Sequence, residues 1–267
     1  MDNYLIIAGT GSLPRIIKEN LPEAKVLGFI SDTPDIEPDI TVSVGEVGKV
    51  LSFARDNSIN KIIFAGGMNK PDFSQIKPDA EGAKLLAKII AGKFLRFGKG
   101  GMGDDSILSK IINFLESKGF EVVAANDVVK SLVATSGLIA GEAPNEQMKI
   151  DIELGMTAAR NLGKLDIGQA VVVEDGVVLA TENVEGTADL IKRAGELKRS
   201  YGGVLVKACK PQQDMRVDLP SIGEKTVLQI VAAGLAGIAV ESGKSLILEK
   251  DEVINRANQC KVFVFGA

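Results

Sequence analysis

The segment from Lys210 to Gly223, KPQQDMRVDLPSIG, concentrates side chains that can bind phosphate and a metal ion. Its polar residues include Lys210, Gln212, Gln213, Asp214, Arg216 and Asp218. The lysine and the arginine can neutralise phosphoryl oxygens, and the two adjacent glutamines can orient a water molecule or a carbonyl group. The last aspartate, Asp218, is a hard oxygen ligand of the kind that Mg²⁺ prefers. The segment therefore predicts a site for a phosphate and a divalent ion, and a merely solvated loop is the alternative.

The absence of histidine narrows the chemistry that this chain can perform. It excludes Ser-His-Asp and Cys-His catalysis, HExxH zinc sites and phosphoesterases whose two metal ions are bridged by histidine. The two cysteines, Cys209 and Cys260, are too few for a ligand cluster, and we expect both to be buried or incidental. Chemistry must come from carboxylates, Lys, Arg, side-chain amides, hydroxyls, backbone N–H groups or a bound ion.

A glycine-rich loop, GTGS, begins at Gly9, directly after an apolar run and before a helical pattern. In an α/β fold, free backbone N–H groups at such a turn can receive a phosphate. The residues concerned are Gly9, Gly11, Ser12 and Leu13. Asp32, about twenty residues further on, stands where a dinucleotide fold places its ribose-binding acid. Pro14 occupies the position of the third glycine, so a nicotinamide cofactor is less favoured, and a structural turn is the alternative to any ligand.

Two further loops carry groups that could bind the same ligand. AGGMNKPDF follows another expected strand, so Gly66, Asn69 and Lys70 should lie at the same edge of the sheet as the first loop. A plain Gly-Gly turn is the alternative there. GKGGMGDDS contains Asp104 and Asp105, which could reach a bound ion or substrate, although the first of them could simply cap the helix that follows.

The first half of the chain alternates short apolar runs with helical patterns. Strands are expected at residues 4–8, 27–30, 41–44, 61–67 and 120–125, and helices at 13–20, from about 48, at 79–91 and at 104–118. This alternation is the signature of a parallel sheet covered on both faces. We therefore predict an α/β, Rossmann-like domain over residues 1–133, followed by a Gly- and Pro-containing linker at 134–145.

The second half, residues 146–267, changes character and predicts a mixed α/β (α+β) domain. We expect helices at 146–162, 186–197 and 224–233, a hairpin around Asp175-Gly176, a strand at 203–208, and closing strands near 245–249 and 261–265. The apolar window 227–240 is typical of a buried helix running into a strand. Thr187 follows the second strand of this hairpin and lies at the start of a helix, so its hydroxyl is either a ligand group or a helix cap.

Charge and hydropathy limit the partners. Lys and Arg number 31 against 35 Asp and Glu, a net charge of −4, which argues against a bulk electrostatic grip on nucleic acid. No run of eighteen or more apolar residues occurs, and the amino terminus lacks the pattern of a signal peptide. We expect a cytoplasmic protein that does not span a membrane but can touch one from outside.

Several long motifs, in the same order, resemble one family over essentially the whole chain. They are IAGTGSLP, FAGGMNKPDF, GKGGMGDDSIL, LDIGQAVVVEDGVVLATENVEGTADL, and KPQQDMRVDLPSIG followed by AAGLAGIAVESGKSLILE. The chain resembles the UDP-2,3-diacylglucosamine pyrophosphatase family of lipid A biosynthesis, of the histidine-free kind called LpxI. The resemblance implies a Mg²⁺-dependent hydrolase, with Mn²⁺ as the alternative ion. It also implies attack of water at the α-phosphorus, which releases UMP and 2,3-diacylglucosamine 1-phosphate (lipid X).

The resemblance further implies site residues and partners. Asp218 is the aspartate of the family's VDLP motif and is assigned first to metal binding and catalysis, while Thr187 and Gln213 match other motif positions. The chain departs from the family pattern at Ala188, where an aspartate is expected directly after the threonine; Asp189 comes one place later. A homodimer bound peripherally to the inner face of the cytoplasmic membrane is implied. The rival interpretation is a non-catalytic nucleotide-sugar or lipid-binding module.

Overall fold

The chain forms two compact units. The computed structural model describes residues 2–68, 76–94, 104–199 and 202–267, and the side chains of residues 92–106 stay outside the description. The first unit comprises Met1–Val129 and Asp214–Val217, and the second comprises Lys130–Gln213 and Asp218–Ala267.

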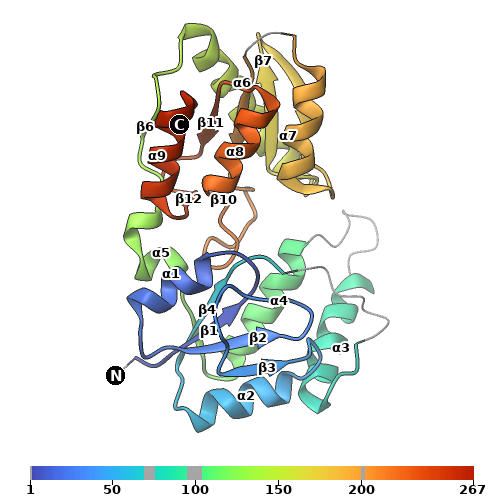
Figure 1. Cartoon of the computed structure of the whole chain (residues 1–267). Coiled ribbons are helices and arrows are strands. Elements are labelled where there is room, and N and C mark those ends of the chain that lie inside the picture. The colour runs from blue at the N-terminus through green and yellow to red at the C-terminus, as the bar shows by residue number, and fades with distance from the viewer. Residues whose placement is uncertain (1, 69–75, 95–103, 200–201) are drawn as a thin grey trace. The chain divides into compact units, whose positions relative to one another are not determined.

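The first unit is built on a parallel sheet of five strands in the order β3-β2-β1-β4-β5 (Figure 1). Its elements are β1 (Tyr4–Ala8), α1 (Leu13–Asn20), β2 (Lys25–Phe29), β3 (Ile40–Val42), α2 (Val47–Asp56), β4 (Lys61–Ala65), α3 (Ala80–Phe94), α4 (Asp104–Ser117), β5 (Glu121–Val122) and α5 (Ala125–Val128). This doubly wound arrangement confirms the Rossmann-like architecture predicted from the alternating pattern.

Helices cover both faces of this sheet. α1 and α5 pack against β1 and β4, and α1 buries Ile17 completely. On the other face, Leu5 and Ile7 of β1 join the core that Leu51 of α2 and Ile112 of α4 complete. Because strand side chains alternate between faces, a strand covered on both sides is apolar along nearly its whole length, as YLIIA is.

The second unit is built on a mixed sheet of six strands in the order β6-β13-β11-β9-β7-β8. Its elements are a 3₁₀ turn η1 (Lys130–Leu132), β6 (Gly137–Ala140), α6 (Glu146–Lys164), β7 (Ala170–Glu174), β8 (Val177–Thr181), α7 (Gly186–Leu197), β9 (Val204–Lys207), β10 (Ser221–Ile222), α8 (Glu224–Ala233), β11 (Gly237–Val240), β12 (Leu246–Ile247), α9 (Lys250–Cys260) and β13 (Phe263–Gly266). β9, β11 and β13 are parallel, whereas β6, β7 and β8 each pair antiparallel with a neighbour. The predicted mixed architecture is confirmed.

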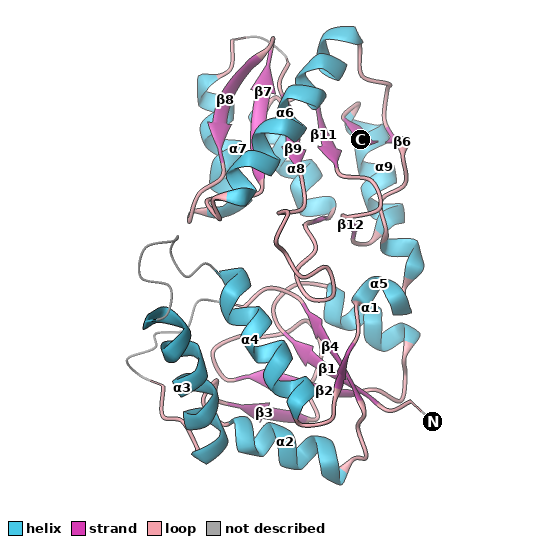
Figure 2. Ribbon diagram, turned by 180° about the vertical axis from the view of Figure 1, so that it is seen from behind, coloured by secondary structure: helices cyan, strands magenta, loops and turns pink. Residues whose placement is uncertain are grey.

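Two apolar cores lie on the two faces of this second sheet. Val171 and Val173 of β7 pack with Ile152 of α6, whereas Val172 packs with Leu190 of α7 and with residues of α8 and α9. Figure 2 shows α6 on one side of the strands and the other three helices behind them. The fully buried sequence AVVVE therefore serves both cores.

The hairpin predicted at Asp175-Gly176 is present between β7 and β8. Both residues adopt positive φ, 49° and 75°, as a type I′ turn requires. The carboxylate of Asp151 in α6 accepts from both backbone N–H groups, at 3.0 and 2.7 Å. A buried acid thus fixes the turn that the sequence alone could locate.

Residues 134–145, expected to be a linker, include β6. This strand pairs antiparallel with β13 and forms an edge of the second sheet. Gly137 and Gly141, both with positive φ, enclose only three other residues, so the strand resembles a flexible connection in sequence. The strand expected at 120–125 is also shorter than predicted, because the chain enters α5 at Ala125.

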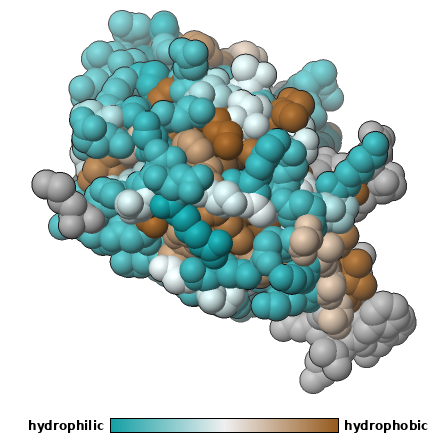
Figure 3. All heavy atoms as spheres, turned by 90° about the horizontal axis from the view of Figure 1, so that it is seen from below, coloured by the Kyte–Doolittle hydropathy of each residue, from teal (hydrophilic) through white to brown (hydrophobic). Residues whose placement is uncertain are grey.

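The exterior is mainly hydrophilic on the face drawn in Figure 3, with apolar side chains scattered among charged ones. Such scattered apolar residues are normal on protein surfaces. Within the described ranges, no helix combines the length and the hydropathy that a membrane span requires.

Candidate active site

Four polar residues lie where strands of the second unit's sheet begin or end, on the side of the sheet where β9 and β11 have their carboxyl ends. Gln169 comes directly before β7, Glu182 directly follows β8, Lys207 ends β9, and Glu241 directly follows β11. Because β7 is antiparallel to β8 and β9, while β11 is parallel to β9, these positions meet at the same edge. The segment that follows β9 is the polar loop from Ala208 to Pro220, of which residues 208–213 and 218–220 belong to the second unit. Loops at the carboxyl ends of parallel strands are the usual place for ligands in α/β sheets.

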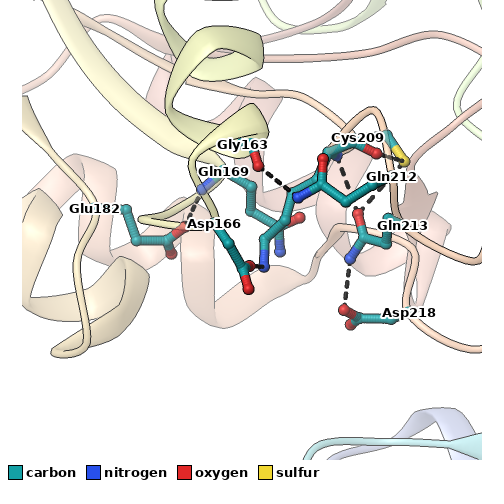
Figure 4. A network of polar contacts seen from close by, with 9 residues as sticks. Gly163, Asp166, Gln169, Glu182, Cys209, Gln212, Gln213 and Asp218 are labelled. Atoms are coloured by element: carbon teal, nitrogen blue, oxygen red, sulfur yellow. Dashed lines mark hydrogen bonds and ion pairs between the residues drawn. The ribbon is translucent and has the colours of Figure 1, made fainter. Parts of the chain in front are cut away.

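Gln213 organises this loop (Figure 4). Its Nε2 donates to Asp218 Oδ2 at 2.5 Å, and its Oε1 accepts from the Lys210 backbone N–H at 3.1 Å and from the Cys209 thiol at 3.4 Å. Gln213 is only 7% exposed. The structure therefore joins Gln213 and Asp218, which the sequence placed in one site.

Lys210 and Gln212 fasten the same loop to the end of α6. Lys210 Nζ lies 2.6 Å from Asp166 Oδ1, and Gln212 Nε2 donates to the Gly163 carbonyl at 2.6 Å. Figure 4 shows the contact of Gln212 with Gly163 beside the Gln213–Asp218 pair. The Lys210 ammonium thus has a carboxylate partner, and its action on a phosphoryl group stays a prediction.

Glu182, Thr187 and Lys207 form a second cluster of hydrogen-bonded polar side chains. The Thr187 hydroxyl donates to Glu182 Oε1 at 2.5 Å, and Lys207 Nζ donates to Thr187 Oγ1 at 3.1 Å and to the Ser221 carbonyl at 3.3 Å. Burial lowers the pKa of Lys207, while the charges of Glu182 and Asp218 act in the opposite direction. α7 starts at Gly186 with Glu185 as its N-cap residue, so Thr187 lies inside the helix and the helix-cap alternative does not describe it.

Glu241 anchors the start of the polar loop. Its carboxylate accepts from the Cys209 backbone N–H at 3.0 Å, from Arg160 at 3.1 Å and from Lys244 at 3.0 Å. Burial raises the pKa of Glu241, but the hydrogen bonds from Lys244, Cys209 and Arg160 outweigh it, so the pKa lies below its usual value of 4.5. The ionised form therefore stabilises the folded state.

We expect Glu241→Ala to lower the free energy of unfolding by about 1–3 kcal/mol, because the buried Cys209 N–H loses its acceptor. Glu241→Gln keeps an acceptor and should lose less. Because the pKa of Glu241 is lower in the folded state, its ionised form adds fully to the free energy of unfolding above pH 4.5. This contribution disappears as the pH falls through the lower pKa of the folded state. Urea unfolding at neutral and acidic pH measures the free energy of unfolding. The difference in this free energy between wild type and Glu241→Gln should become smaller in acid. Equal losses in both variants would contradict the acceptor argument.

In the first unit, the two glycine loops meet as predicted. The Thr10 backbone N–H donates to the Gly67 carbonyl at 2.7 Å, and the Gly67 N–H returns a bond to Thr10 at 3.0 Å. The next three backbone N–H groups, those of Gly11, Ser12 and Leu13, have no acceptor among the described residues. They lie at the start of α1, where an anion is electrostatically favoured.

Asp32 lies beyond β2, as the sequence predicted. It is buried, and its Oδ2 accepts from the Ser31 hydroxyl at 3.1 Å. Together with Thr33, Pro34 and other residues of 28–41 it lines an open pocket of about 660 Å³. A pocket of this size can hold a small ligand.

Arg216 belongs to the first unit, apart from the network of Asp218. Its guanidinium pairs with both carboxylate oxygens of Asp214, at 3.0 and 2.8 Å, and with Glu116 at 2.6 Å. These two acids, Asp214 first, raise the pKa of Arg216. Its predicted role toward phosphate stays a prediction.

Four predicted ligand residues are beyond what the structure describes in full. Asn69 and Lys70 lie outside the described residues. Asp104 and Asp105 open α4, where the sequence predicted a helix start, but their side chains are not described.

The fit of a metal ion rests on Asp218. Among the described residues, no group of three or more Cys, Asp or Glu could hold an ion by itself. Mg²⁺, however, commonly binds one or two carboxylates and takes its other ligands from substrate phosphate and water. A single carboxylate such as Asp218, held by Gln213, suits such a shared site.

Sequence reasoning missed five polar residues of this site: Asp166, Gln169, Glu182, Lys207 and Glu241. The available signal was a charge at the end of an apolar run, as in GVLVK and VVLATE. A charged residue in such a place lies at a sheet edge and needs a partner when it is buried.

Family models match nearly the whole chain. The LpxI N-terminal domain matches residues 3–132, and the LpxI C-terminal domain matches residues 135–265. A protein of Caulobacter vibrioides named UDP-2,3-diacylglucosamine pyrophosphatase LpxI is 34% identical over 275 aligned positions, which cover 98% of this chain and 96% of the relative.

Proposed function

This chain belongs to the LpxI family, and we propose that it hydrolyses UDP-2,3-diacylglucosamine, the compound in the name of its Caulobacter relative. The reaction cleaves the pyrophosphate bond and releases UMP and 2,3-diacylglucosamine 1-phosphate (lipid X), a step of lipid A biosynthesis. The single observation that carries the proposal is the match over both units to a pyrophosphatase. The buried polar cluster around Asp218 supports it, because a binding module has little need for so many buried charges.

The chain's own residues suit phosphoanhydride hydrolysis. The bond already has a good leaving group, so positioning and charge neutralisation can supply the catalysis without histidine. Gln213 holds Asp218 in one orientation, and Lys207 brings a positive charge into the same cluster. Mg²⁺, or Mn²⁺, when bound would supply charge neutralisation at the phosphoryl oxygens, and Asp218 would hold it. Water attacks the α-phosphorus, and Thr187, Lys210 and Arg216 complete the proposed catalytic set.

The first unit is proposed to bind the nucleotide part of the substrate. The N–H groups of Gly11, Ser12 and Leu13 are suited to a phosphate, because no described residue uses them. The remaining proposed binding residues are Gly9, Gly66, Asn69, Lys70, Asp104, Asp105 and Gln212.

The substrate also suggests where the enzyme works. A molecule with two acyl chains is held in a membrane, so we propose a cytoplasmic enzyme that binds the inner face of the cytoplasmic membrane peripherally. The family resemblance is the reason to propose that the enzyme is a homodimer. The lack of a membrane-spanning helix in the described ranges is compatible with this proposal.

³¹P NMR of the protein with UDP-2,3-diacylglucosamine and Mg²⁺ tests the reaction. We expect UMP and a sugar 1-phosphate in the complete mixture and neither product with EDTA. Oxygen-18 from labelled water should appear in UMP if the α-phosphorus is attacked. An unchanged spectrum from folded protein that binds the substrate would instead favour the non-catalytic binding module.

A further inference from the structure

The Thr187 hydroxyl is held between a carboxylate and an ammonium group. Its oxygen lies 2.5 Å from Glu182 Oε1 and 3.1 Å from Lys207 Nζ. The other oxygen of Glu182 accepts from the Gln169 backbone N–H at 3.0 Å, which fixes the carboxylate in turn. Glu182 and Lys207 are only 7% and 6% exposed, whereas Thr187 between them is half-buried, so solvent reaches the hydroxyl more readily than its two partners.

The chemistry of the two partners fixes the direction of each hydrogen bond. A lysine ammonium has no acceptor and a carboxylate has no donor. With Lys207 as an ammonium and Glu182 as a carboxylate, Thr187 accepts from Lys207 and gives its one proton to Glu182. A hydroxyl has two lone pairs, and one is left over. Thr187 can offer a bound molecule an acceptor but not a donor.

A purely structural role explains this arrangement poorly. Replacing a buried ion pair by packed apolar residues is often neutral or stabilising, so buried charges alone are weak evidence for stability. Thr187 is not the N-cap residue of α7 either, because Glu185 occupies that position. Lys207 Nζ also donates to the carbonyl of Ser221, three residues after Asp218, which brings the Thr187 hydroxyl to the segment that carries the Gln213–Asp218 pair.

We propose that Glu182 and Lys207 are positioning residues that hold the Thr187 hydroxyl as a hydrogen-bond acceptor for the attacking water. This inference rests on the proposed hydrolysis. A phosphoryl oxygen carries no proton and cannot donate to this lone pair, whereas water can. The water oxygen bonds to the α-phosphorus, and the bond from that phosphorus to the bridging oxygen breaks, with its electron pair leaving on the sugar 1-phosphate. One water proton passes to Thr187 as the Thr187 proton moves to Glu182, which later releases it to solvent.

The pair Thr187→Val and Thr187→Ser tests the lone pair without changing a charge. Valine keeps the shape but has no acceptor, so we expect kcat to fall about 10²-fold, with KM changed less than about threefold, as for loss of a group that acts on the nucleophile. Serine retains the hydroxyl and should recover most of the lost kcat. A structural role alone would give no such recovery once the melting temperatures of both variants match that of wild type.

Glu182→Gln tests the direction of the hydrogen bond. The amide can still accept from Gln169 with its oxygen while its NH₂ donates to Thr187, which turns the Thr187 proton outward. We expect kcat to fall as in Thr187→Val, with substrate binding retained by calorimetry. If wild type turns over and Thr187→Val keeps the wild-type kcat, the inference is wrong while the proposed function stands. If folded wild type shows no hydrolysis, the proposed function itself fails.

Discussion

Asp218→Asn should lower kcat by about 10²–10³-fold while the protein remains folded. Asparagine has the shape of aspartate, and its side-chain oxygen can still accept from Gln213 Nε2. The substitution removes only the negative charge, which is what a bound divalent ion requires and what offsets the buried Lys207. A loss of this size would therefore report on charge rather than on packing.

Initial rates of hydrolysis over a range of Mg²⁺ concentrations measure the effect. We expect a lower kcat and a higher Mg²⁺ requirement. Asp175→Asn is a matched control in the same unit, because Asn tolerates the positive φ of this hairpin turn and the residue is remote in sequence from the polar loop. It should keep wild-type kinetics. Wild-type kcat in Asp218→Asn would remove Asp218 from both its metal-binding and its catalytic roles.

The sequence located site residues that are local to one segment. Gln213 and Asp218 are five positions apart in one loop, and the residue types alone predicted that they share a site. The meeting of the glycine loops was also predictable, because both follow parallel strands of one sheet. Local spacing and a topological rule were sufficient in these cases.

The meeting of Glu182 and Lys207 at the Thr187 hydroxyl was not predictable in the same way. The two residues are separated by α7 and end different strands, so only the antiparallel register of β7 with β8 and β9 brings them together. One of the two partners of Arg216 is equally remote: Glu116 lies 100 positions away in α4. A sequence pattern can mark a charged residue at a strand end, but the identity of its partner depends on the register.

The sequence pattern also failed to predict helix α9. α9 is polar for most of its length, and only Val253 and Ala257 are fully buried in its core-facing side. Two buried residues four apart are too weak a periodic signal to predict a helix of eleven residues. Packing against β6 and α8 supplies the stability that the pattern does not indicate.

Gly66→Ala should destabilise the first unit by about 3 kcal/mol or more. Gly66 has a φ of 89°, a region that other residues rarely adopt. An added Cβ would lie 2.4 Å from the Thr10 carbonyl oxygen and 2.9 Å from the Gly9 carbonyl carbon. Both are backbone atoms, so the loops must separate for the methyl group to fit.

Gly11→Ala is the matched control for the contact. Gly11 has a similar φ of 91°, but among the described residues no atom beyond its chain neighbours lies within 4 Å of the position that an added Cβ would take. The substitution should cost only the backbone term, about 1 kcal/mol. Urea unfolding gives the two free energies, and hydrogen exchange should show faster opening at residues 8–13 and 62–67 in Gly66→Ala alone.

Equal destabilisation of the two variants would mean that backbone strain, not the close approach of the loops, requires glycine. A larger loss of free energy of unfolding in Gly66→Ala would show that glycine is required here mainly because the loops after β1 and β4 approach each other closely. That approach is the condition for the N–H groups of Ser12 and Leu13 to act on one ligand together with the second loop.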